Sequence, residues 1–320
     1  MTDRIIMANW YWGRIAVESG FEVLKKHGLA IDAVEKGIMA VEDAPSVDSV
    51  GTGGIPNLDG VSELDASIMV GNTFSAGGVS NLVRTRNPIS VARKVMELTP
   101  HVILAGDGAT KFARSCGFPD YDPVTPEARE KWRKLREVLL NTKDEQQATE
   151  EFTDIMGWRS DVGSLMRSLK LLTDRGIIMF HDTVGVLALD ENNIVGGTST
   201  SGWPLRLPGR VSDSSIIGAG LYATPSAAAT ASGQGEFAIK HTLSRKVCDF
   251  IEAGMKPKDA CEEALLMVLR KEKVDAILTV IAMDRKGNIG GATTKESFSY
   301  CYRRESDSKI SEVYPEPVSL

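Results

Sequence analysis

The chain has 320 residues, of which 42% are apolar and 25% are charged, and its net charge is −6. This balance is typical of a globular protein and excludes a disordered or fibrous one. The acidic charge, with no basic block, predicts that nucleic acid is not a partner. The length is sufficient for a large hydrophobic core, and we expect a single domain over 1–320.

The N-terminal sequence MTDRIIMANW lacks the basic and apolar regions of a signal peptide. No apolar stretch approaches the length of a membrane span. The four cysteines and four histidines are scattered, without metal-like or paired spacing. We therefore expect a cytoplasmic protein with free thiols, no metal, no cofactor and no membrane partner.

In the first half of the chain, apolar positions at helical spacing alternate with short apolar runs. Helices are predicted over 13–27, 32–43, 87–97 and 126–140, and strands over 64–70 and 102–105. Asp32 is the expected N-cap of the second helix, and Thr125 precedes a proline at the first position of the fourth. Residues 141–160 are polar and acidic, which predicts a surface connection.

The second half contains two similar hairpin patterns. VLALDENNIVGGTST and VIAMDRKGNIGGATT each read as a strand, an aspartate, a short turn and a second strand. They predict one antiparallel sheet or two facing sheets. Helices are expected over 236–253 and 257–271, and a last strand over 297–303.

A stretch of small residues, Gly218 to Ala223, matches the dinucleotide fingerprint G-x-G-x-x-A after an apolar run. The fingerprint needs a helix to begin there, within a βαβ unit. Thr224-Pro225 follows at once, and the neighbouring hairpins are antiparallel in type. The glycines therefore predict close backbone packing and not a nucleotide site.

His181-Asp182-Thr183 stands between two apolar runs. A threonine hydroxyl is a poor nucleophile without a base, and one solution is cleavage of the chain just before the residue. The freed α-amine, with a pKa of about 7.7–8.0 in model peptides, can then act as the base. The bond to cleave is Asp182–Thr183, and the Asp182 carboxylate is the expected proton acceptor. The alternative for these three residues is an ordinary polar entry into a strand.

Several motifs in the same order resemble the glycosylasparaginase family of N-terminal nucleophile hydrolases, also called type-2 asparaginases. The motifs are Asn9-Trp10, LAIDAVEKG (29–37), SVGTGG (49–54), LDASIMVG (64–71), NPISVARKVME (87–97), HDTVG (181–185), GTSTSG (197–202), GRVSDSSIIGAGLY (209–222) and ASGQGE (231–236). The resemblance covers most of the chain except about 118–178. It implies an α/β (α+β) fold, a four-layer αββα sandwich, cleaved into chains 1–182 and 183–320.

The resemblance also implies roles for individual residues. Thr183 would be the nucleophile and new N-terminus, and Thr200 would hydrogen-bond near its α-amine. Catalytic and substrate-binding residues are then Thr183, Thr200, Asp182 (for self-cleavage), Arg210, Asp213, Ser232, Gly233, Gly235 and Trp10. Arg210 would hold the substrate α-carboxylate and Asp213 its α-ammonium, which suits the chemistry of both side chains.

In the same resemblance Ser232 and Gly233 would form the oxyanion hole, and Trp10 would line the pocket. Ordinary structural roles stay open: a surface ion pair for Arg210 and Asp213, a helix N-cap for Ser232-Gly233, and core packing for Trp10. The chain departs from the family at Ser212, commonly glycine, and at Ser232, commonly threonine. The apolar residues 176–180 before the junction also depart from the charge expected there.

The predicted activity is hydrolysis of the side-chain amide of N4-(β-N-acetylglucosaminyl)-L-asparagine through an acyl-threonine intermediate. L-asparagine or a β-aspartyl dipeptide shares the amino-acid head group and is the alternative substrate. An unprocessed protein that only binds a small amino acid is the alternative of another class. The resemblance also implies a homodimer of processed αβ units.

Overall fold

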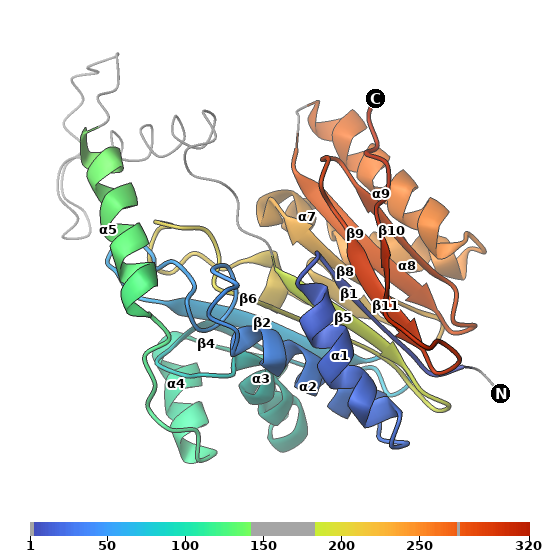
Figure 1. The fold of residues 1–320 in the computed structure, drawn as a ribbon, viewed down its shortest axis with the longest axis horizontal. Helices are drawn as coiled ribbons and strands as arrows, with labels where there is room; N and C mark the ends of the chain where they lie inside the picture. Colours follow the sequence, from blue (N-terminus) through green and yellow to red (C-terminus); the bar gives the residue numbers. More distant parts are fainter. Residues whose placement is uncertain (1–2, 142–182, 274–275) are drawn as a thin grey trace.

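The computed structural model describes residues 3–141, 183–273 and 276–320 (Figure 1). Asp182 and nearly all of the predicted surface connection at 141–160 lie outside the described residues. The described elements form a mixed α/β fold with two sheets, which confirms the predicted fold class at that level.

The larger sheet has eight strands in the order β12-β11-β1-β5-β6-β2-β3-β4. The strands are β1 (Ile5–Asn9), β2 (Glu63–Val70), β3 (Ser75–Val83), β4 (Ile103–Ala105), β5 (Val184–Leu189), β6 (Ile194–Thr200), β11 (Tyr300–Arg304) and β12 (Ser311–Val313). All neighbouring pairs are antiparallel except β3 and β4. Strands β1 and β5 are distant in sequence but adjacent in the middle of the sheet.

The smaller sheet has four antiparallel strands in the order β10-β9-β8-β7. They are β7 (Leu221–Ala223), β8 (Ala227–Gly233), β9 (Leu278–Asp284) and β10 (Ile289–Thr293). The two predicted hairpins therefore belong to different sheets, since β5–β6 lies in the larger sheet and β9–β10 in the smaller one.

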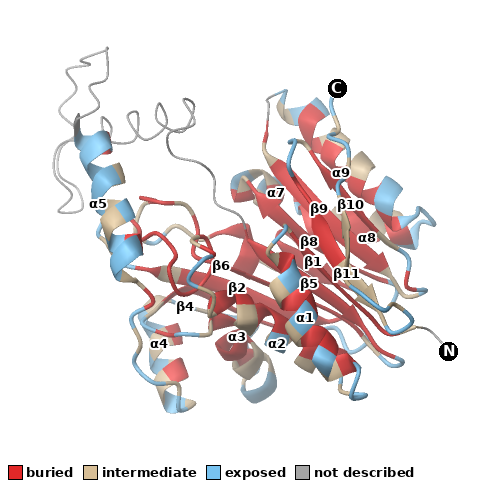
Figure 2. Cartoon of the chain, in the orientation of Figure 1, coloured by how far each residue is buried: buried red, intermediate tan, exposed pale blue. Residues whose placement is uncertain are grey.

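The described helices cover the sheets from outside, except α5, which extends away from them (Figures 1 and 2). They are α1 (Gly13–Leu24), α2 (Ala30–Glu42), α3 (Pro88–Leu98), α4 (Gly106–Ser115), α5 (Pro126–Asn141), α7 (Gly235–His241), α8 (Leu243–Glu252) and α9 (Pro257–Glu272). Helices α1 to α4 contact the larger sheet, and α8 and α9 contact the smaller one. The strands are almost wholly buried except those near the edges of the larger sheet, β4, β11 and β12 (Figure 2).

Strand β1 shows how the two hydrophobic cores are divided. Its side chains alternate between the two faces of the sheet, as in any strand. Ile5 and Met7 pack into a core shared with the smaller sheet, α8 and α9. Ile6 and Ala8 pack into a second core with α1, α2 and α3. The larger sheet is thus buried on both faces.

Two sequence-based predictions about helix ends are wrong. The residues expected as one helix over 236–253 form α7 and α8, because Thr242 adopts a left-handed φ of 47° between them. The first amides of α8 donate to the carbonyls of Gly218 and Ala219, which fixes the new helix direction. Asp32 does not cap α2, which begins after Leu29; the Asp190 carboxylate accepts from the Ala30 amide instead, at 2.7 Å.

The glycine-rich stretch before β7 forms a turn, and the next residues enter a strand. A Cβ atom on Gly220 would lie 2.5 Å from the Asp213 carbonyl oxygen. Close packing therefore requires glycine here, as predicted, and no helix follows to bind a dinucleotide phosphate.

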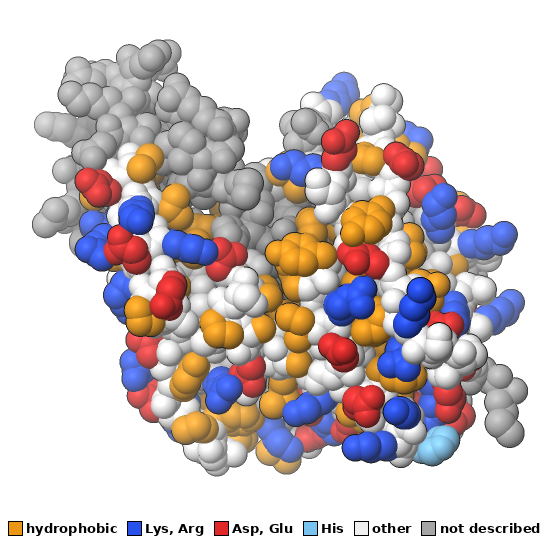
Figure 3. Space-filling view, viewed as in Figure 1, with side chains coloured by type: hydrophobic (Ala, Val, Ile, Leu, Met, Phe, Trp, Pro, Cys, Tyr) orange, Lys and Arg blue, Asp and Glu red, His pale blue; other side chains and the backbone are white. Residues whose placement is uncertain are grey.

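None of the helices in the described ranges is long and apolar enough to cross a membrane. On the face shown in Figure 3, acidic and basic side chains are interspersed, without a large field of one sign.

Candidate active site

Thr183 lies immediately before β5, in the interior of the protein, with 4% of its surface exposed. Its amide N–H donates to the Oγ of Ser232 at 3.0 Å, across 49 residues of sequence. Its hydroxyl lies 3.2 Å from the Oγ of Ser214. The fold therefore brings the residue predicted as nucleophile against hydroxyl groups from two other segments.

Asn9, at the end of β1, fixes the backbone around Thr183. Its side-chain amide donates to the Thr183 carbonyl at 2.9 Å, and its carbonyl oxygen accepts from the Gly185 amide at 2.7 Å. Asn9 is 2% exposed, so these two bonds satisfy a buried side chain that would otherwise be costly. The sequence motif contained Asn9, but sequence reasoning gave it no role.

Thr200 ends β6, beside the start of β5. Val184 pairs with Ser199, so Thr183 and Thr200 are the next residues along this ladder. The Thr200 hydroxyl donates to the Ser49 carbonyl at 3.4 Å and accepts from the Gly202 amide at 3.0 Å. These bonds hold the loop after β6, and contact of Thr200 with the α-amine of Thr183 stays a prediction.

Glu42, at the end of α2, hydrogen-bonds to strand β6 close to Thr200. Its carboxyl group accepts from the Ser199 hydroxyl at 2.7 Å and from the Ile89 amide at 3.1 Å. Burial raises the pKa of Glu42 to about 8, against the opposing effect of these hydrogen bonds. Glu42 therefore fastens strand β6, one residue before Thr200, to α2 and α3.

Ser232 and Gly233 end β8 beside Thr183. Ser232 Oγ accepts from the Thr183 amide and, at 3.4 Å, from the Trp10 indole N–H. Both bonds use the oxygen as acceptor, which leaves the Ser232 hydroxyl proton to donate to another group. Gly233 has a φ of 113°, and a Cβ there would lie 2.3 Å from the Ile277 carbonyl oxygen. The N-cap of α7 is Gln234, so the helix-cap alternative does not describe Ser232 and Gly233.

Trp10 is half-buried, with a left-handed φ of 63°. Its ring stacks on Trp12 at 5.5 Å and meets the edge of Phe298 at 5.1 Å. Tyr11 packs against Trp12 and is 65% exposed. Trp10 thus links Ser232 to an aromatic cluster, defined here as Trp10, Tyr11, Trp12 and Phe298, that reaches the surface.

Arg210, Asp213 and Gly235 come together at the start of α7. A Cβ on Gly235 would lie 2.4 Å from Asp213 Oδ1 and 3.2 Å from Arg210 Nη2. Any side chain at position 235 would therefore crowd Asp213 and Arg210, the two residues predicted to bind the substrate head group. The ion pair of Arg210 is with Glu236, at 2.9 Å, and not with Asp213.

Asp213 is a buried carboxyl group, 2% exposed. Within the part of the chain that the structure describes, its Oδ2 has no hydrogen-bond partner. Burial raises the pKa of Asp213 to about 7, nearby Arg210 lowers it, and Glu236 and Asp65 raise it further. A cation bound at Asp213 would supply the missing partner and favour the ionised carboxylate.

The loop from 201 to 212 contains Arg210 and is held in place by another of its residues, the buried Arg206. Arg206 is 2% exposed and donates to the carbonyls of Glu63 and Trp203. Burial lowers the pKa of Arg206 to about 10. The Glu63 carboxylate accepts from the Gly209 amide at 3.0 Å, and the Arg210 guanidinium lies 5.0 Å from the Trp203 ring. These contacts fix Arg210 at the end of the loop.

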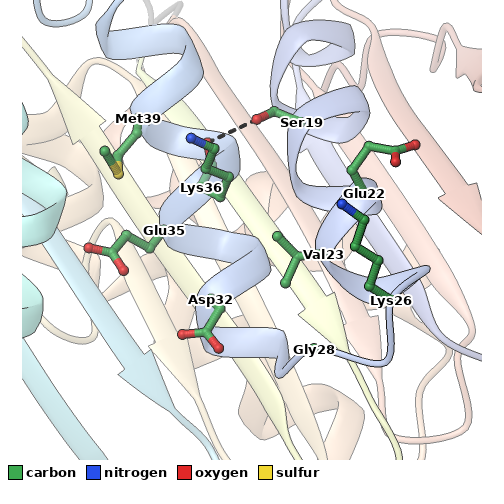
Figure 4. A pocket seen from close by; sticks show the side chains of 9 residues that line it. All are labelled: Ser19, Glu22, Val23, Lys26, Gly28, Asp32, Glu35, Lys36 and Met39. Atoms are coloured by element: carbon green, nitrogen blue, oxygen red, sulfur yellow. Dashed lines mark hydrogen bonds between the residues drawn. The ribbon is translucent and has the colours of Figure 1, made fainter.

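An open groove of about 490 Å³ lies between the outer helices α1 and α2 (Figure 4). Its lining residues are Ser19, Glu22, Val23, Lys26, Gly28, Asp32, Glu35, Lys36 and Met39. None of them belongs to the predicted site, and Figure 4 shows their charged ends spread around the groove without a common focus. Thr183 and its neighbours stay the predicted site.

The described residues contain no group of three or more histidine, cysteine, aspartate or glutamate side chains that could hold a metal ion. Thr183 contacts two hydroxyls and a side-chain amide, and Arg210 and Asp213 lie together at Gly235. Such groups suit acyl transfer and recognition of a charged amino acid.

Comparison with known proteins gives one consistent family. The family model described as Asparaginase matches residues 13–313. A plant-type L-asparaginase from Pyrococcus furiosus is 42% identical over 292 residues, covering 91% of this chain and 89% of that protein. The N(4)-(β-N-acetylglucosaminyl)-L-asparaginases of Elizabethkingia miricola and Mus musculus are 36% and 33% identical, over 96% and 91% of this chain and 83% and 84% of those proteins. The chain therefore belongs to the asparaginase family of amide-bond hydrolases.

Proposed function

We propose that the protein is an N-terminal nucleophile hydrolase that cleaves its own Asp182–Thr183 bond and then hydrolyses the side-chain amide of an asparagine-type substrate. The main support is the placement of Thr183, a buried threonine beside the hydroxyls of Ser232 and Ser214. The nearby Arg210 and Asp213 have the opposite charges needed for a free amino-acid head group.

In the proposed self-cleavage, the Thr183 hydroxyl oxygen attacks the Asp182 carbonyl carbon. The O–C bond forms, the C–N bond breaks, and the hydroxyl proton ends on the nitrogen, which becomes the α-amine. Water then hydrolyses the resulting ester and returns a free Thr183 hydroxyl. The Asn9 bonds to the Thr183 carbonyl and the Gly185 amide hold the attacking residue in place during this step.

In the proposed turnover, the Thr183 α-amine takes the hydroxyl proton, and the oxygen attacks the substrate amide carbon. The Ser232 hydroxyl and the Gly233 amide would stabilise the oxyanion. The amine leaves with the proton, and water hydrolyses the acyl-threonine ester to release aspartate. No cofactor takes part in this scheme.

We propose that the architecture is the four-layer αββα sandwich of N-terminal nucleophile hydrolases, formed by one domain over 1–320. The two buried cores on opposite faces of β1 support this proposal. Because the larger sheet combines strands from both sides of the junction, β1 with β5 and β2 with β6, the two chains would stay associated after cleavage.

For the leaving group we favour N-acetylglucosamine linked to asparagine. The aromatic cluster at Trp10 supports this choice, because sugar rings pack well on aromatic faces and Trp10 adjoins Ser232. The alternative is L-asparagine itself or a β-aspartyl dipeptide, and the 42% identity with a plant-type L-asparaginase supports it. Parallel assays with the three substrates decide between them.

We also propose a cytoplasmic location and a homodimer of processed αβ units. The oligomeric state can be tested by light scattering of the purified protein, which should give twice the mass of the 34.6 kDa chain.

Purified protein should separate into two bands on a denaturing gel, and the smaller fragment should begin TVGVLALD. This result is expected because the junction stands directly before β5, with Thr183 already held by Asn9 and Ser232. N-terminal sequencing of both bands checks the cleavage position. A chain that stays intact after long incubation, and hydrolyses none of the three substrates, would favour the protein that only binds an amino acid.

Inhibition by the product L-aspartate should weaken as the pH falls from 8 to 6. Burial raises the pKa of Asp213 to about 7, so its charge is lost through this range, and with it the attraction for the ligand's ammonium group. Succinate, which lacks the amine, is the control, and its inhibition of the enzyme should not weaken in this way. Equal pH dependence of the two inhibition constants would remove Asp213 from ammonium binding.

A further inference from the structure

Ser214 is the residue whose hydroxyl contacts the Thr183 hydroxyl. The two oxygens are 3.2 Å apart, and Ser214 is completely buried. In the hydrogen bonds of the described residues, Ser214 is the partner of the Thr183 hydroxyl, whereas the bonds of Thr200 go to Ser49 and Gly202. Its position therefore bears on the oxygen that performs the proposed chemistry.

The backbone of Ser214 is held from both sides. Its carbonyl accepts from the hydroxyls of Ser67 and Thr198, each at 2.6 Å, and its amide donates to the Ser212 Oγ at 3.3 Å. Two of these groups, Ser67 and Thr198, lie on the buried strands β2 and β6 of the larger sheet. A hydroxyl placed in this way needs little reorganisation when the charge on its partner changes.

Ser212 is one of the positions where the chain departs from the family pattern, which commonly has glycine. Its φ of −83° does not require glycine, and its side chain is used as the acceptor for the Ser214 amide. A glycine at position 212 would lack this acceptor. Serine therefore adds a hydrogen bond to the turn that contains Ser214.

We propose that Ser214 is a further catalytic residue, whose hydroxyl donates to the Thr183 oxygen and stabilises it as it loses its proton. The inference rests on the proposed function, in which that oxygen is the nucleophile of both self-cleavage and turnover. Ser214 transfers no proton in this scheme: the proton of Thr183 goes to nitrogen, while Ser214 keeps its own and supplies a hydrogen bond. That bond strengthens as the oxygen becomes negative.

The test compares Ser214→Ala with Ser215→Ala. Ser215 is the matched control, because it is the next residue, is equally buried, and bonds to Ser80 and the Ser212 carbonyl. A hydrogen bond to a charged group contributes roughly 1.5–3 kcal/mol, which corresponds to about 10–100-fold in rate. Ser214→Ala should therefore slow self-cleavage by about 10–100-fold and lower kcat for the processed enzyme by a similar factor, with KM unchanged.

Ser215→Ala should keep both rates near those of the wild type, although it loses a comparable buried hydroxyl. Ser214→Cys keeps the size and a weak donor, so its rates should lie between those of Ser214→Ala and the wild type. Thermal unfolding of each variant shows whether it is folded, and the cysteine variant answers the question if the alanine variant is not. Cleavage and kcat at wild-type level in a folded Ser214→Ala variant would overturn the assignment.

The wild type and Thr183→Ala serve as reference arms. If the wild type neither cleaves itself nor hydrolyses any substrate, the proposed function fails, and the role of Ser214 fails with it. If the wild type is active, Thr183→Ala is inactive and Ser214→Ala is fully active, only the inference about Ser214 fails.

Discussion

Replacing Thr183 with alanine should yield a single uncut chain that hydrolyses none of the three amide substrates. The hydroxyl oxygen forms the new bond in both proposed reactions, and no neighbouring group can replace it at that position. Removal of a nucleophile in other acyl-transfer enzymes costs about 10⁴-fold or more in kcat, so we expect activity below detection. A gel over time and an assay of released aspartate measure the two losses.

Thr183→Ser is the matched variant, since it keeps the hydroxyl and removes only the methyl group. It should retain part of both activities, because a serine hydroxyl has the same chemistry with more rotational freedom. Both variants should remain folded, with thermal unfolding near that of the wild type. Release of aspartate by Thr183→Ala at a rate near that of the wild type would show that another residue is the nucleophile.

The elements with clear periodicity were predicted well from the sequence, whereas strands of small residues were not. β3 contains SAGGVSNLV and β8 contains AAATASG, which are rich in alanine, glycine and serine and contain few of the β-branched residues, and none of the aromatic residues, typical of strands. Their composition follows from close packing between layers: a Cβ on Gly77 would lie 2.2 Å from the Ala92 carbonyl oxygen, in α3. A tertiary constraint of this kind leaves no periodic pattern to recognise.

The candidate site shows the same division between local and long-range information. Thr183, Arg210, Asp213 and Ser232 lie in short motifs, and the resemblance to a family supplied their roles. Asn9 could not be assigned in this way, because its side chain contacts Thr183 and Gly185, which lie 174 and 176 positions further along the chain. Only the pairing of β1 with β5 brings it to Thr183.

Ser214 and Glu236 were missed for a related reason. Serine beside an aspartate is typical of a turn, and glutamate in the first turn of a helix is common for reasons of the helix dipole. The structure turns Ser214 towards Thr183 and Glu236 towards Arg210. Arg210 thus forms an ion pair with Glu236 and also lowers the pKa of the buried Asp213, whereas Glu236 raises that pKa.

Arg210→Ala and Asp213→Ala should each weaken recognition of a different end of the substrate. A charge-assisted contact to an ionised group is worth roughly 1.5–3 kcal/mol, or about 10–100-fold in kcat/KM. Asp213→Ala should cause this loss with L-asparagine but little loss with succinamate, which has no α-amine. Arg210→Ala should cause it with L-asparagine but little with an analogue whose α-carboxylate is replaced by a carboxamide. Values of kcat/KM for the wild type and both variants, on all three compounds, give the coupling energies.

Self-cleavage is the internal control for these two variants. The reaction at Asp182–Thr183 uses no external amino acid, so both variants should be processed at a rate near that of the wild type, which also shows that they fold. Glu236→Gln is an additional variant: it removes both the charge that pairs with Arg210 and a charge that raises the pKa of Asp213, so it should change binding at both ends of the substrate. If the losses are the same whichever end of the substrate is altered, Arg210 and Asp213 serve the fold, and the head group is recognised elsewhere.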